Sequence, residues 1–204
     1  MNNLTTFYLV RHGNTEWNVK RLLQGHSDSP LTNEGLEQAK NLAIEFRNIK
    51  FDRIFSSDLL RAKRTAEIIV LEHKIAVEAT QLLRERSYGN LEGQPAAEFE
   101  KVDAILDKLT DEERYTYKYK ELETDEEIVT RFITFMREIA ISNPNKNILI
   151  VTHGGSMRAL LKRLGYGTYE ELKHGAVKNG AWVKLETDGV DFFVKETKGV
   201  NKNG

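Results

Sequence analysis

The 204-residue sequence contains no cysteine, and this absence excludes several classes of protein at once. Without thiols the chain can form no disulfide framework, no zinc ribbon, no Cys-ligated iron–sulfur cluster and no thiolate nucleophile. Proline is rare, with 3 residues, while 30% of the residues are charged, which is typical of a folded globular domain rather than a disordered or collagen-like chain. A chain without cysteine fits a reducing compartment, so we expect a cytoplasmic protein.

The sequence also lacks an excess of charge of either sign, since 30 Lys and Arg oppose 31 Asp and Glu. Binding of nucleic acid needs a basic field, so we expect no nucleic-acid partner. No run of about 18 apolar residues is present, and no positively charged leader precedes the first apolar run, so we expect neither a membrane partner nor export. The length predicts a single domain over residues 1–204 that is a monomer or a homodimer.

Three short strands are expected at residues 7–10, 53–55 and 148–151, where apolar residues stop abruptly at polar ones, as is typical of buried strands. Apolar residues at helical spacing follow each strand. Thr32 is expected to cap the first of these helices, and hydroxyl or carboxylate groups of residues 56–58 are expected to cap the second. This alternation of strand and helix predicts an α/β fold with a parallel sheet.

Further strands are expected at residues 76–80, 177–187 and 190–197, the last two as an antiparallel pair. Residues 86–145 read as a helical insertion, within which the charged, tyrosine-rich residues 107–125 are expected to form a mobile lid. The predicted fold is therefore α/β, with a mostly parallel central sheet, helices on both faces, a mixed edge strand and a helical lid insertion. The apolar residues of the later helix of the insertion are expected to be core: Ile128, Phe132, Phe135, Met136 and Ile139.

Basic side chains recur where these strands are expected to end. Arg11 and His12 follow the first strand, Arg61 lies in the first turn of the helix after the second, and His153 follows the strand at 148–151. Taken alone, an arginine is usually a surface cation and a histidine usually a structural residue. Ligands of parallel α/β sheets bind at the carboxyl ends of the strands, and several cations placed there together favour an anionic ligand. A phosphate fits best.

The residue types suggest how such a phosphate would react. A guanidinium holds two phosphoryl oxygens in a rigid fork, so Arg11 and Arg61 suit a clamp. Neighbouring guanidinium charge disfavours the protonated imidazole, which leaves one histidine neutral and nucleophilic while a second stabilises charge on the transferring group. The histidines show neither His-x-His nor His-Glu-x-x-His spacing, so we predict no metal and no cofactor.

Ordered motifs between residue 7 and about residue 158 resemble those of the histidine phosphatase superfamily, the phosphoglycerate mutase-like enzymes. The motifs are Arg11-His12-Gly13-Asn14-Thr15 with Asn18; Gln24-Gly25, Asp28, Pro30-Leu31-Thr32 and Gly35; Ser56-Ser57-Asp58-Leu59 with Arg61-Ala62 and Thr65-Ala66; Leu83-Arg84-Glu85 with Gly89 and Glu92-Gly93; and Val151-Thr152-His153-Gly154-Gly155.

The resemblance implies a role for each matching residue. His12 would be the phosphorylated nucleophile, with Arg11, Arg61 and His153 around its phosphate, and Glu85 would be the general acid and base. Outside the resemblance, the ordinary explanation of Glu85 is an ion pair with a neighbouring arginine, Arg84 or Arg86. Further phosphate- or substrate-binding positions are Asn18, Gln24, Gly25 and Gly154, of which Asn18 and Gln24 have an alternative role in bonding loop backbone groups.

The predicted function is a metal-independent phosphomonoester hydrolase that acts through a phosphohistidine on a small phosphorylated metabolite. One alternative is a phosphoglycerate mutase, which would need a bisphosphoglycerate primer; another is a non-catalytic protein that binds phosphorylated ligands. Mutases of the family resemble this chain near Arg86, Tyr88 and Gly89 but continue with Gly-Leu-Asn-Lys, whereas residues 90–94 here are Asn-Leu-Glu-Gly-Gln, which favours the hydrolase. Basic residues of the insertion either contact a second anionic group or form a solvated helix face: Lys101, Lys108, Arg114, Lys118 and Lys120.

Overall fold

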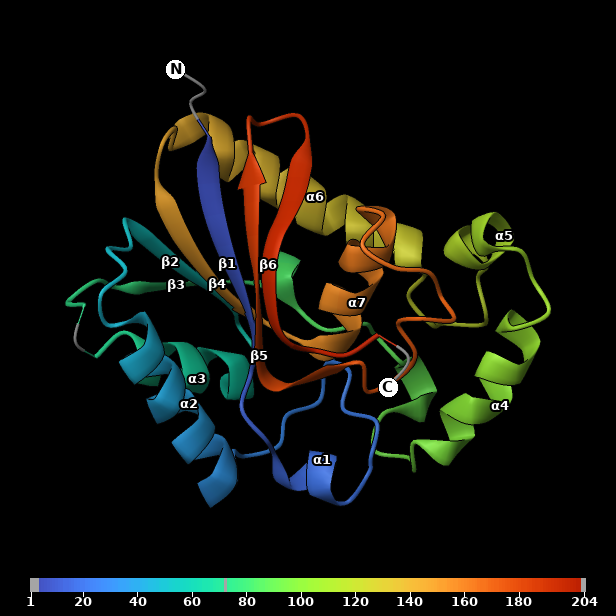
Figure 1. Cartoon of the computed structure of the whole chain (residues 1–204). Coiled ribbons are helices and arrows are strands. Elements are labelled where there is room, and N and C mark those ends of the chain that lie inside the picture. Colours follow the sequence, from blue (N-terminus) through green and yellow to red (C-terminus); the bar gives the residue numbers. More distant parts are fainter. Residues whose placement is uncertain (1–3, 72, 203–204) are drawn as a thin grey trace.

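A computed structural model describes residues 4–71 and 73–202, and a mixed six-stranded sheet forms its centre (Figure 1). The strands are β1 (Thr5–Arg11), β2 (Arg53–Ser57), β3 (Val77–Thr80), β4 (Asn147–Thr152), β5 (Val177–Thr187) and β6 (Phe192–Val200). Their order in the sheet is β3-β2-β4-β1-β5-β6. The first four are parallel to their neighbours, while β5 is antiparallel to β1 and β6 to β5. The mostly parallel sheet is confirmed, and its mixed edge consists of two strands.

Helices cover both faces of this sheet, as predicted (Figure 1). On one face lie α2 (Asn33–Phe46) and α3 (Leu60–Ile69), and on the other lie α6 (Asp125–Ser142) and α7 (Gly154–Arg163). The remaining helices are α1 (Glu16–Val19), α4 (Ala97–Leu106), α5 (Asp111–Thr116) and the 3-10 turns η1 (Gln81–Leu83) and η2 (Gly89–Leu91). Within the described residues, no helix has both the length and the apolar character needed to cross a bilayer.

The two hydrophobic cores follow from the alternation of side chains along the buried strands. In β1, Phe7 and Leu9 pack with α6 and α7, whereas Val10 packs with α2 and α3 and Tyr8 lies against that second core. Successive residues of a strand point to opposite faces, so a continuous apolar run supplies both cores at once. The central strand β4 does the same, with Ile148 and Ile150 on the α6 side and Leu149 and Val151 on the α3 side.

The caps of the first two predicted helices have different origins. Thr32 caps α2 as expected, because its side chain accepts a hydrogen bond from the Gly35 N–H. The expected cap of α3 by residues 56–58 is wrong: the N-cap is Leu59, whose side chain makes no capping bond. Instead, the Asp28 carboxylate accepts a hydrogen bond from the Leu60 N–H at 3.0 Å. A loop distant in sequence thus replaces the local cap.

The residues of the predicted insertion, 86–145, contribute to two different cores. The apolar residues of α6 lie in the main core beside the strands, since Ile128, Phe132 and Met136 are fully buried there. The outer segment, residues 86–124, instead packs against Leu23 of the loop after α1 and forms a separate small core with its own Tyr88, Phe99, Val102, Leu106 and Leu122. A 3.6-residue period shows which face of a helix is apolar but not which layer that face covers.

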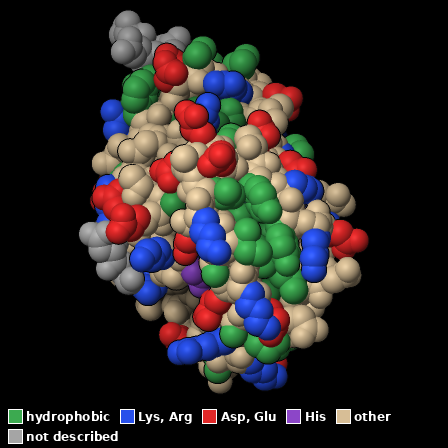
Figure 2. All heavy atoms as spheres, turned by 90° about the vertical axis from the view of Figure 1, so that its right-hand side faces the viewer, with side chains coloured by type: hydrophobic (Ala, Val, Ile, Leu, Met, Phe, Trp, Pro, Cys, Tyr) green, Lys and Arg blue, Asp and Glu red, His purple; other side chains and the backbone are tan. Residues whose placement is uncertain are grey.

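The surface on the side of α4 and α5 carries acidic and basic side chains next to one another, with a group of hydrophobic side chains near its centre (Figure 2). The predicted lid, residues 107–125, includes α5, which Thr110 caps through a capping box with Glu113. Its mobility stays a prediction.

Replacing Phe132 by alanine tests the assignment of α6 to the main core. The side chain is fully buried, so the cavity left behind should lower the free energy of unfolding by about 3–5 kcal/mol. Tyr117→Ala in the outer segment, where the side chain is 40% exposed, should cost less than about 1 kcal/mol. Urea unfolding followed by circular dichroism measures both, and equal losses would contradict the assignment.

Candidate active site

The site is assembled where three neighbouring strands end. β1 ends at Arg11, which lies opposite Thr152 of β4, so His12 and His153 follow at adjacent positions. Their ring centroids lie 5.1 Å apart, with 62° between the ring planes. Arg61 reaches the same place from the first turn of α3, after β2. The predicted convergence of two arginines and two histidines is therefore present in the structure.

A cavity of about 330 Å³ opens at this edge of the sheet. His153 is fully buried behind it, with its ring against that of His12. In the described part of the chain, no three imidazole or carboxylate side chains gather where they would share a metal ion. All the other predicted site residues line the cavity: Arg11, His12, Asn18, Gln24, Gly25, Arg61, Glu85 and Gly154.

The ring of His12 is held in one orientation by its own chain. Its Nδ1 lies 2.8 Å from the carbonyl oxygen of Gly13, and because a carbonyl only accepts, Nδ1 carries the proton. Burial first, and then the charges of Arg61 and Arg11, hold the pKa of His12 well below its ordinary value. The imidazole is therefore neutral at physiological pH, and its Nε2 bears a free lone pair.

Backbone carbonyls fix both guanidinium groups. Arg61, 1% exposed, donates to the carbonyls of Ser27 and Gly25 at 2.7 Å each and pairs with Asp28 at 3.2 Å. Arg11 donates from Nη1 to a backbone carbonyl of β5 at 2.6 Å. In both groups Nε is buried and has no hydrogen-bond partner among the described residues. A buried donor without a partner costs about 1–3 kcal/mol, so an acceptor arriving in the cavity would be stabilised.

His153 is the second imidazole with unsatisfied groups. Both ring nitrogens are buried and, in the described chain, neither has a hydrogen-bond partner. Burial and then the charge of Arg61 hold the pKa of His153 well below its ordinary value, so this ring is also neutral at physiological pH. A neutral imidazole still offers one N–H, which suits it to donate to a phosphoryl oxygen.

The carboxylate of Glu85 rests on the first turn of α7. Oε1 accepts from the N–H groups of Arg86 at 2.8 Å and Ser156 at 2.9 Å, and Oε2 accepts from the Gly155 N–H at 2.9 Å. Burial alone raises the pKa of the Glu85 carboxyl, but these backbone donors and the charges of Arg61 and Arg11 outweigh it, so the pKa lies below its ordinary value. The free site therefore holds Glu85 ionised at neutral pH.

The alternative for Glu85, an ion pair with a neighbouring arginine, is wrong. Arg84 donates to both carboxylate oxygens of Asp58, at 2.7 and 2.6 Å. Arg86 turns the other way and pairs with buried Asp125 of α6. The two arginines beside Glu85 are thus already occupied, which leaves its carboxylate on the cavity wall.

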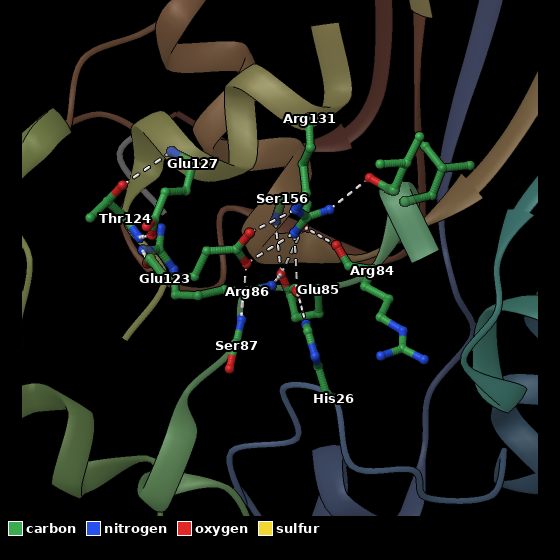
Figure 3. Close-up of polar contacts among 12 residues, drawn as sticks. His26, Arg84, Glu85, Arg86, Ser87, Glu123, Thr124, Glu127, Arg131 and Ser156 are labelled. Atoms are coloured by element: carbon green, nitrogen blue, oxygen red, sulfur yellow. Dashed lines mark hydrogen bonds and ion pairs between the residues drawn. The ribbon is translucent and has the colours of Figure 1, made fainter. Parts of the chain in front are cut away.

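A second set of contacts holds the backbone at Glu85 (Figure 3). Arg131 of α6 donates from Nη2 to the carbonyl of Glu85 at 3.2 Å and from Nη1 to that of Leu82 at 2.7 Å. Its Nε is itself fixed by Glu123 at 2.7 Å. His26, in the loop before α2, places Nε2 3.0 Å from the same Glu85 carbonyl. Side chains from α6 and from the loop before α2 therefore converge on one peptide.

A comparison with known protein families agrees with this geometry, because the family model described as "Histidine phosphatase superfamily (branch 1)" matches residues 7–198. The chain belongs to the histidine phosphatase superfamily. The resemblance seen in its motifs is confirmed, and with it an enzyme of the histidine phosphatase type.

Relatives of this histidine phosphatase carry two kinds of name. The "Uncharacterized phosphatase PhoE" of Bacillus subtilis is 36% identical over 193 residues, covering 95% of this chain and 94% of the relative. A 2,3-bisphosphoglycerate-dependent phosphoglycerate mutase of Cytophaga hutchinsonii is 34% identical over 177 residues, covering 85% and 83%. Among solved structures, Bacillus stearothermophilus YhfR matches with a TM-score of 0.80 and 29% identity, covering 93% of this chain and 95% of the other. The relatives thus include both phosphatases and mutases.

Asn18 and Gln24 differ in how far the loop uses them. The Oδ1 of Asn18 accepts a hydrogen bond from the N–H of Thr15 at 3.1 Å, so Asn18 bonds loop backbone while it lines the cavity of the histidine phosphatase. Gln24 is 7% exposed, and its Oε1 is buried without a partner among the described residues. The structure therefore favours Gln24 over Asn18 as a group with free bonding capacity.

Two glycines permit close packing around the cations. Gly25 has φ +52°, and a Cβ there would lie 2.2 Å from the carboxylate of Glu92. A Cβ at Gly154 would lie 2.9 Å from Nε of Arg11. Side chains at either position would displace the loop or the guanidinium, which explains why glycine stands at both.

Sequence reasoning missed part of the cavity wall. The sequence could have predicted Arg158 as a cavity residue, since it lies four residues after Gly154 and therefore on the same face of α7. The others come from loops and the outer segment, whose positions no local pattern predicts. None of the five basic residues considered in the insertion lines the cavity. The polar residues that were missed are Arg21, Tyr88, Glu100, Arg158 and His174.

Replacing Arg131 by methionine should loosen the peptide that carries Glu85. We expect kcat for para-nitrophenyl phosphate, a general substrate for phosphatases, to fall about tenfold, because the loss of charged hydrogen bonds costs about 1.5–3 kcal/mol when a site depends on them. Arg137→Met is the matched control, since Arg137 also lies on α6 and donates to a carbonyl, that of Val190 at 3.0 Å. Equal kcat values in the two variants, at equal Tm, would contradict the positioning role.

Proposed function

We propose that this histidine phosphatase is a metal-independent phosphomonoester hydrolase that acts on a small phosphorylated metabolite through a phosphohistidine at His12. The state of the His12 ring carries the proposal. Its Nδ1 donates to the Gly13 carbonyl and its pKa is held low, so the Nε2 lone pair is available at neutral pH. A neutral, oriented imidazole among buried cations suits nucleophilic attack on a phosphate.

In the first half-reaction, Nε2 of His12 attacks phosphorus and the bond from phosphorus to the ester oxygen breaks. Arg11, Arg61 and His153 donate to the phosphoryl oxygens as charge shifts onto them. The unpartnered Nε groups of the two arginines and the unpartnered ring of His153 support these roles. Gln24, Asn18, Gly25 and Gly154 complete the wall around the phosphate.

Glu85 is assigned the proton transfers. In the free site it is ionised, because the pKa of its carboxyl lies below the ordinary value. Phosphate monoesters have a second pKa of about 6, so the monoanion brings a proton that Glu85 passes to the leaving oxygen. In the second half-reaction Glu85 takes a proton from water, the resulting hydroxide attacks phosphorus, and the bond from phosphorus to Nε2 breaks.

A phosphoglycerate mutase is the second candidate, favoured by the mutase named among the relatives. Such an enzyme would return the phosphoryl group to a bound phosphoglycerate and would need a bisphosphoglycerate primer. We place the hydrolase first because residues 90–94 depart from the mutase segment. A cytoplasmic location and a monomeric or homodimeric state belong to the same proposal.

Phosphate release in the presence of EDTA tests the proposal directly. We expect inorganic phosphate to appear from small phosphomonoesters, 3-phosphoglycerate among them, without metal and without formation of 2-phosphoglycerate. His12→Ala should lower turnover by about a thousandfold or more and abolish the labelled phosphoenzyme, since the attacking nitrogen is lost. Isomerisation that depends on a bisphosphate primer would instead show a mutase, and binding without either activity would show a non-catalytic phospholigand-binding protein.

The pH dependence of kcat/KM should be set by the proton that Glu85 must receive. Because the lowered pKa keeps Glu85 ionised in the free site, that proton arrives with the phosphate monoanion, whose fraction grows as pH falls toward its second pKa of about 6, so kcat/KM should increase from about pH 8 down to about pH 6. His12 should not limit this rise, since its pKa is held well below its ordinary value.

Glu85→Gln removes the carboxyl group that transfers the proton, so this variant is compared with the wild-type enzyme. It should slow alkyl phosphates, whose leaving oxygen needs the proton, far more than activated aryl phosphates. A wild-type rate that falls between about pH 7 and about pH 6, with an inflection near the ordinary histidine pKa of about 6.5, would contradict the neutral His12. Equal losses for both substrate types in Glu85→Gln would contradict its role as proton donor.

A further inference from the structure

Two cations on the cavity wall have no part in the reaction just described. Arg158 projects from α7 and Arg21 from the loop after α1, and both line the cavity that contains His12. In the described part of the chain, neither guanidinium forms an ion pair or donates a hydrogen bond. Unpaired guanidinium groups in a concave site are available to bind a ligand.

The neighbours of Arg158 show that this lack of a partner is unusual in its surroundings. Lys162, one turn further along α7, pairs with Asp125 at 2.8 Å. Arg114 of α5 pairs with Asp103 at 3.0 Å. These neighbouring cations are therefore held in ion pairs, whereas Arg158 forms none among the described residues and acts on Asp103 only through its charge.

The charge of Arg158 reaches the phosphate-binding groups. Burial lowers the pKa of Arg11 to about 10, and the positive charge of Arg158 contributes to that shift. Arg158 also lies one helical turn, about 5 Å along the axis, beyond Gly154 and Gly155 at the cavity. A ligand that places its phosphate at His12 therefore needs only a short chain to bring a second group to Arg158.

The charges on the outer wall indicate which second group fits. Arg158 and Arg21 bring two positive charges, while Glu100 of α4 lines the same cavity and the charge of Arg158 also acts on the carboxyl of Asp103. With two carboxylates of the chain nearby, a singly charged carboxylate of the ligand meets less repulsion than a dianionic phosphate. A guanidinium also matches the two oxygens of a carboxylate with parallel N–H donors.

We propose that Arg158, with Arg21, forms a carboxylate-binding subsite, and that the substrates of this enzyme are short phosphorylated carboxylic acids. The proposal rests on the proposed function, because the phosphate of the substrate is taken to lie at His12. It goes beyond it by assigning specificity to two residues outside the phosphate pocket. The cavity volume of about 330 Å³ is at the small end of ligand sites and suits such a metabolite.

A matched pair of substrates tests the subsite. 3-Phosphoglycerate and glycerol 3-phosphate share a three-carbon chain and a phosphate, and they differ in a carboxylate against a hydroxymethyl group. We expect kcat/KM to favour 3-phosphoglycerate by about tenfold or more, as charged hydrogen bonds predict. Arg158→Gln should bring this ratio close to one, because its loss falls mainly on 3-phosphoglycerate.

Two further variants sharpen the result. Arg163→Gln is the matched control: Arg163 ends the same helix, lies over the ring of Tyr115 and does not line the cavity, so the ratio should not change. Glu100→Gln should raise the ratio, because it removes a negative charge from the wall that receives the carboxylate. General destabilisation would not lower the ratio of kcat/KM values in Arg158→Gln and raise it in Glu100→Gln.

Binding separates failure of the subsite from failure of the proposed function. In the His12→Ala background, calorimetry should show tighter binding of 3-phosphoglycerate than of glycerol 3-phosphate, and Arg158→Gln should remove the difference. Hydrolysis of both substrates at similar kcat/KM, with similar affinities, would overturn the subsite and leave the hydrolase. Absence of all hydrolysis together with preferential binding of 3-phosphoglycerate would overturn the hydrolase and support the subsite.

Discussion

The burial of two guanidinium groups beside two imidazole rings is the constraint on which the site depends. An unpaired charge removed from water costs several kcal/mol, so Arg61 is surrounded by carbonyls of the Gly25–Ser27 loop and by Asp28. The same charges lower the pKa of His12 and His153 and help keep Glu85 ionised. The site is thus a cationic cavity with neutral imidazoles and one fixed carboxylate, an arrangement suited to an anionic ligand.

The N-terminus of α7 positions several residues of the site. His153 is the N-cap of α7, and the N–H groups of Gly155 and Ser156 hold the Glu85 carboxylate. Arg158 follows one turn later on the same helix. Because a helix is rigid and its N-terminal N–H groups are unpaired, β4 and α7 together set the relative positions of His153, Glu85 and Arg158. Arg131 of α6 adds a contact to the Glu85 peptide from the layer that covers the sheet.

The sequence was informative where the physics is local. Apolar runs predicted β1, β2 and β4, and Thr32 predicted the start of α2, because strand burial and helix capping depend on neighbouring residues. It was misleading where a distant segment intervened. Asp28 caps α3 in place of residues 56–58. That outcome does not follow from periodicity, since it depends on which surfaces meet after folding.

For the site, the sequence by itself determined the family, the strand ends that bear Arg11, His12 and His153, and the residue types available for phosphate chemistry. The tertiary structure decided that Glu85 lies free of Arg84 and Arg86, because those arginines find Asp58 and Asp125 in other elements. It also decided that Arg21 and Arg158 face the cavity while the basic residues of the insertion do not. A charged side chain takes whichever partner the packed elements bring within reach, and that choice involves long-range contacts that no sequence window contains.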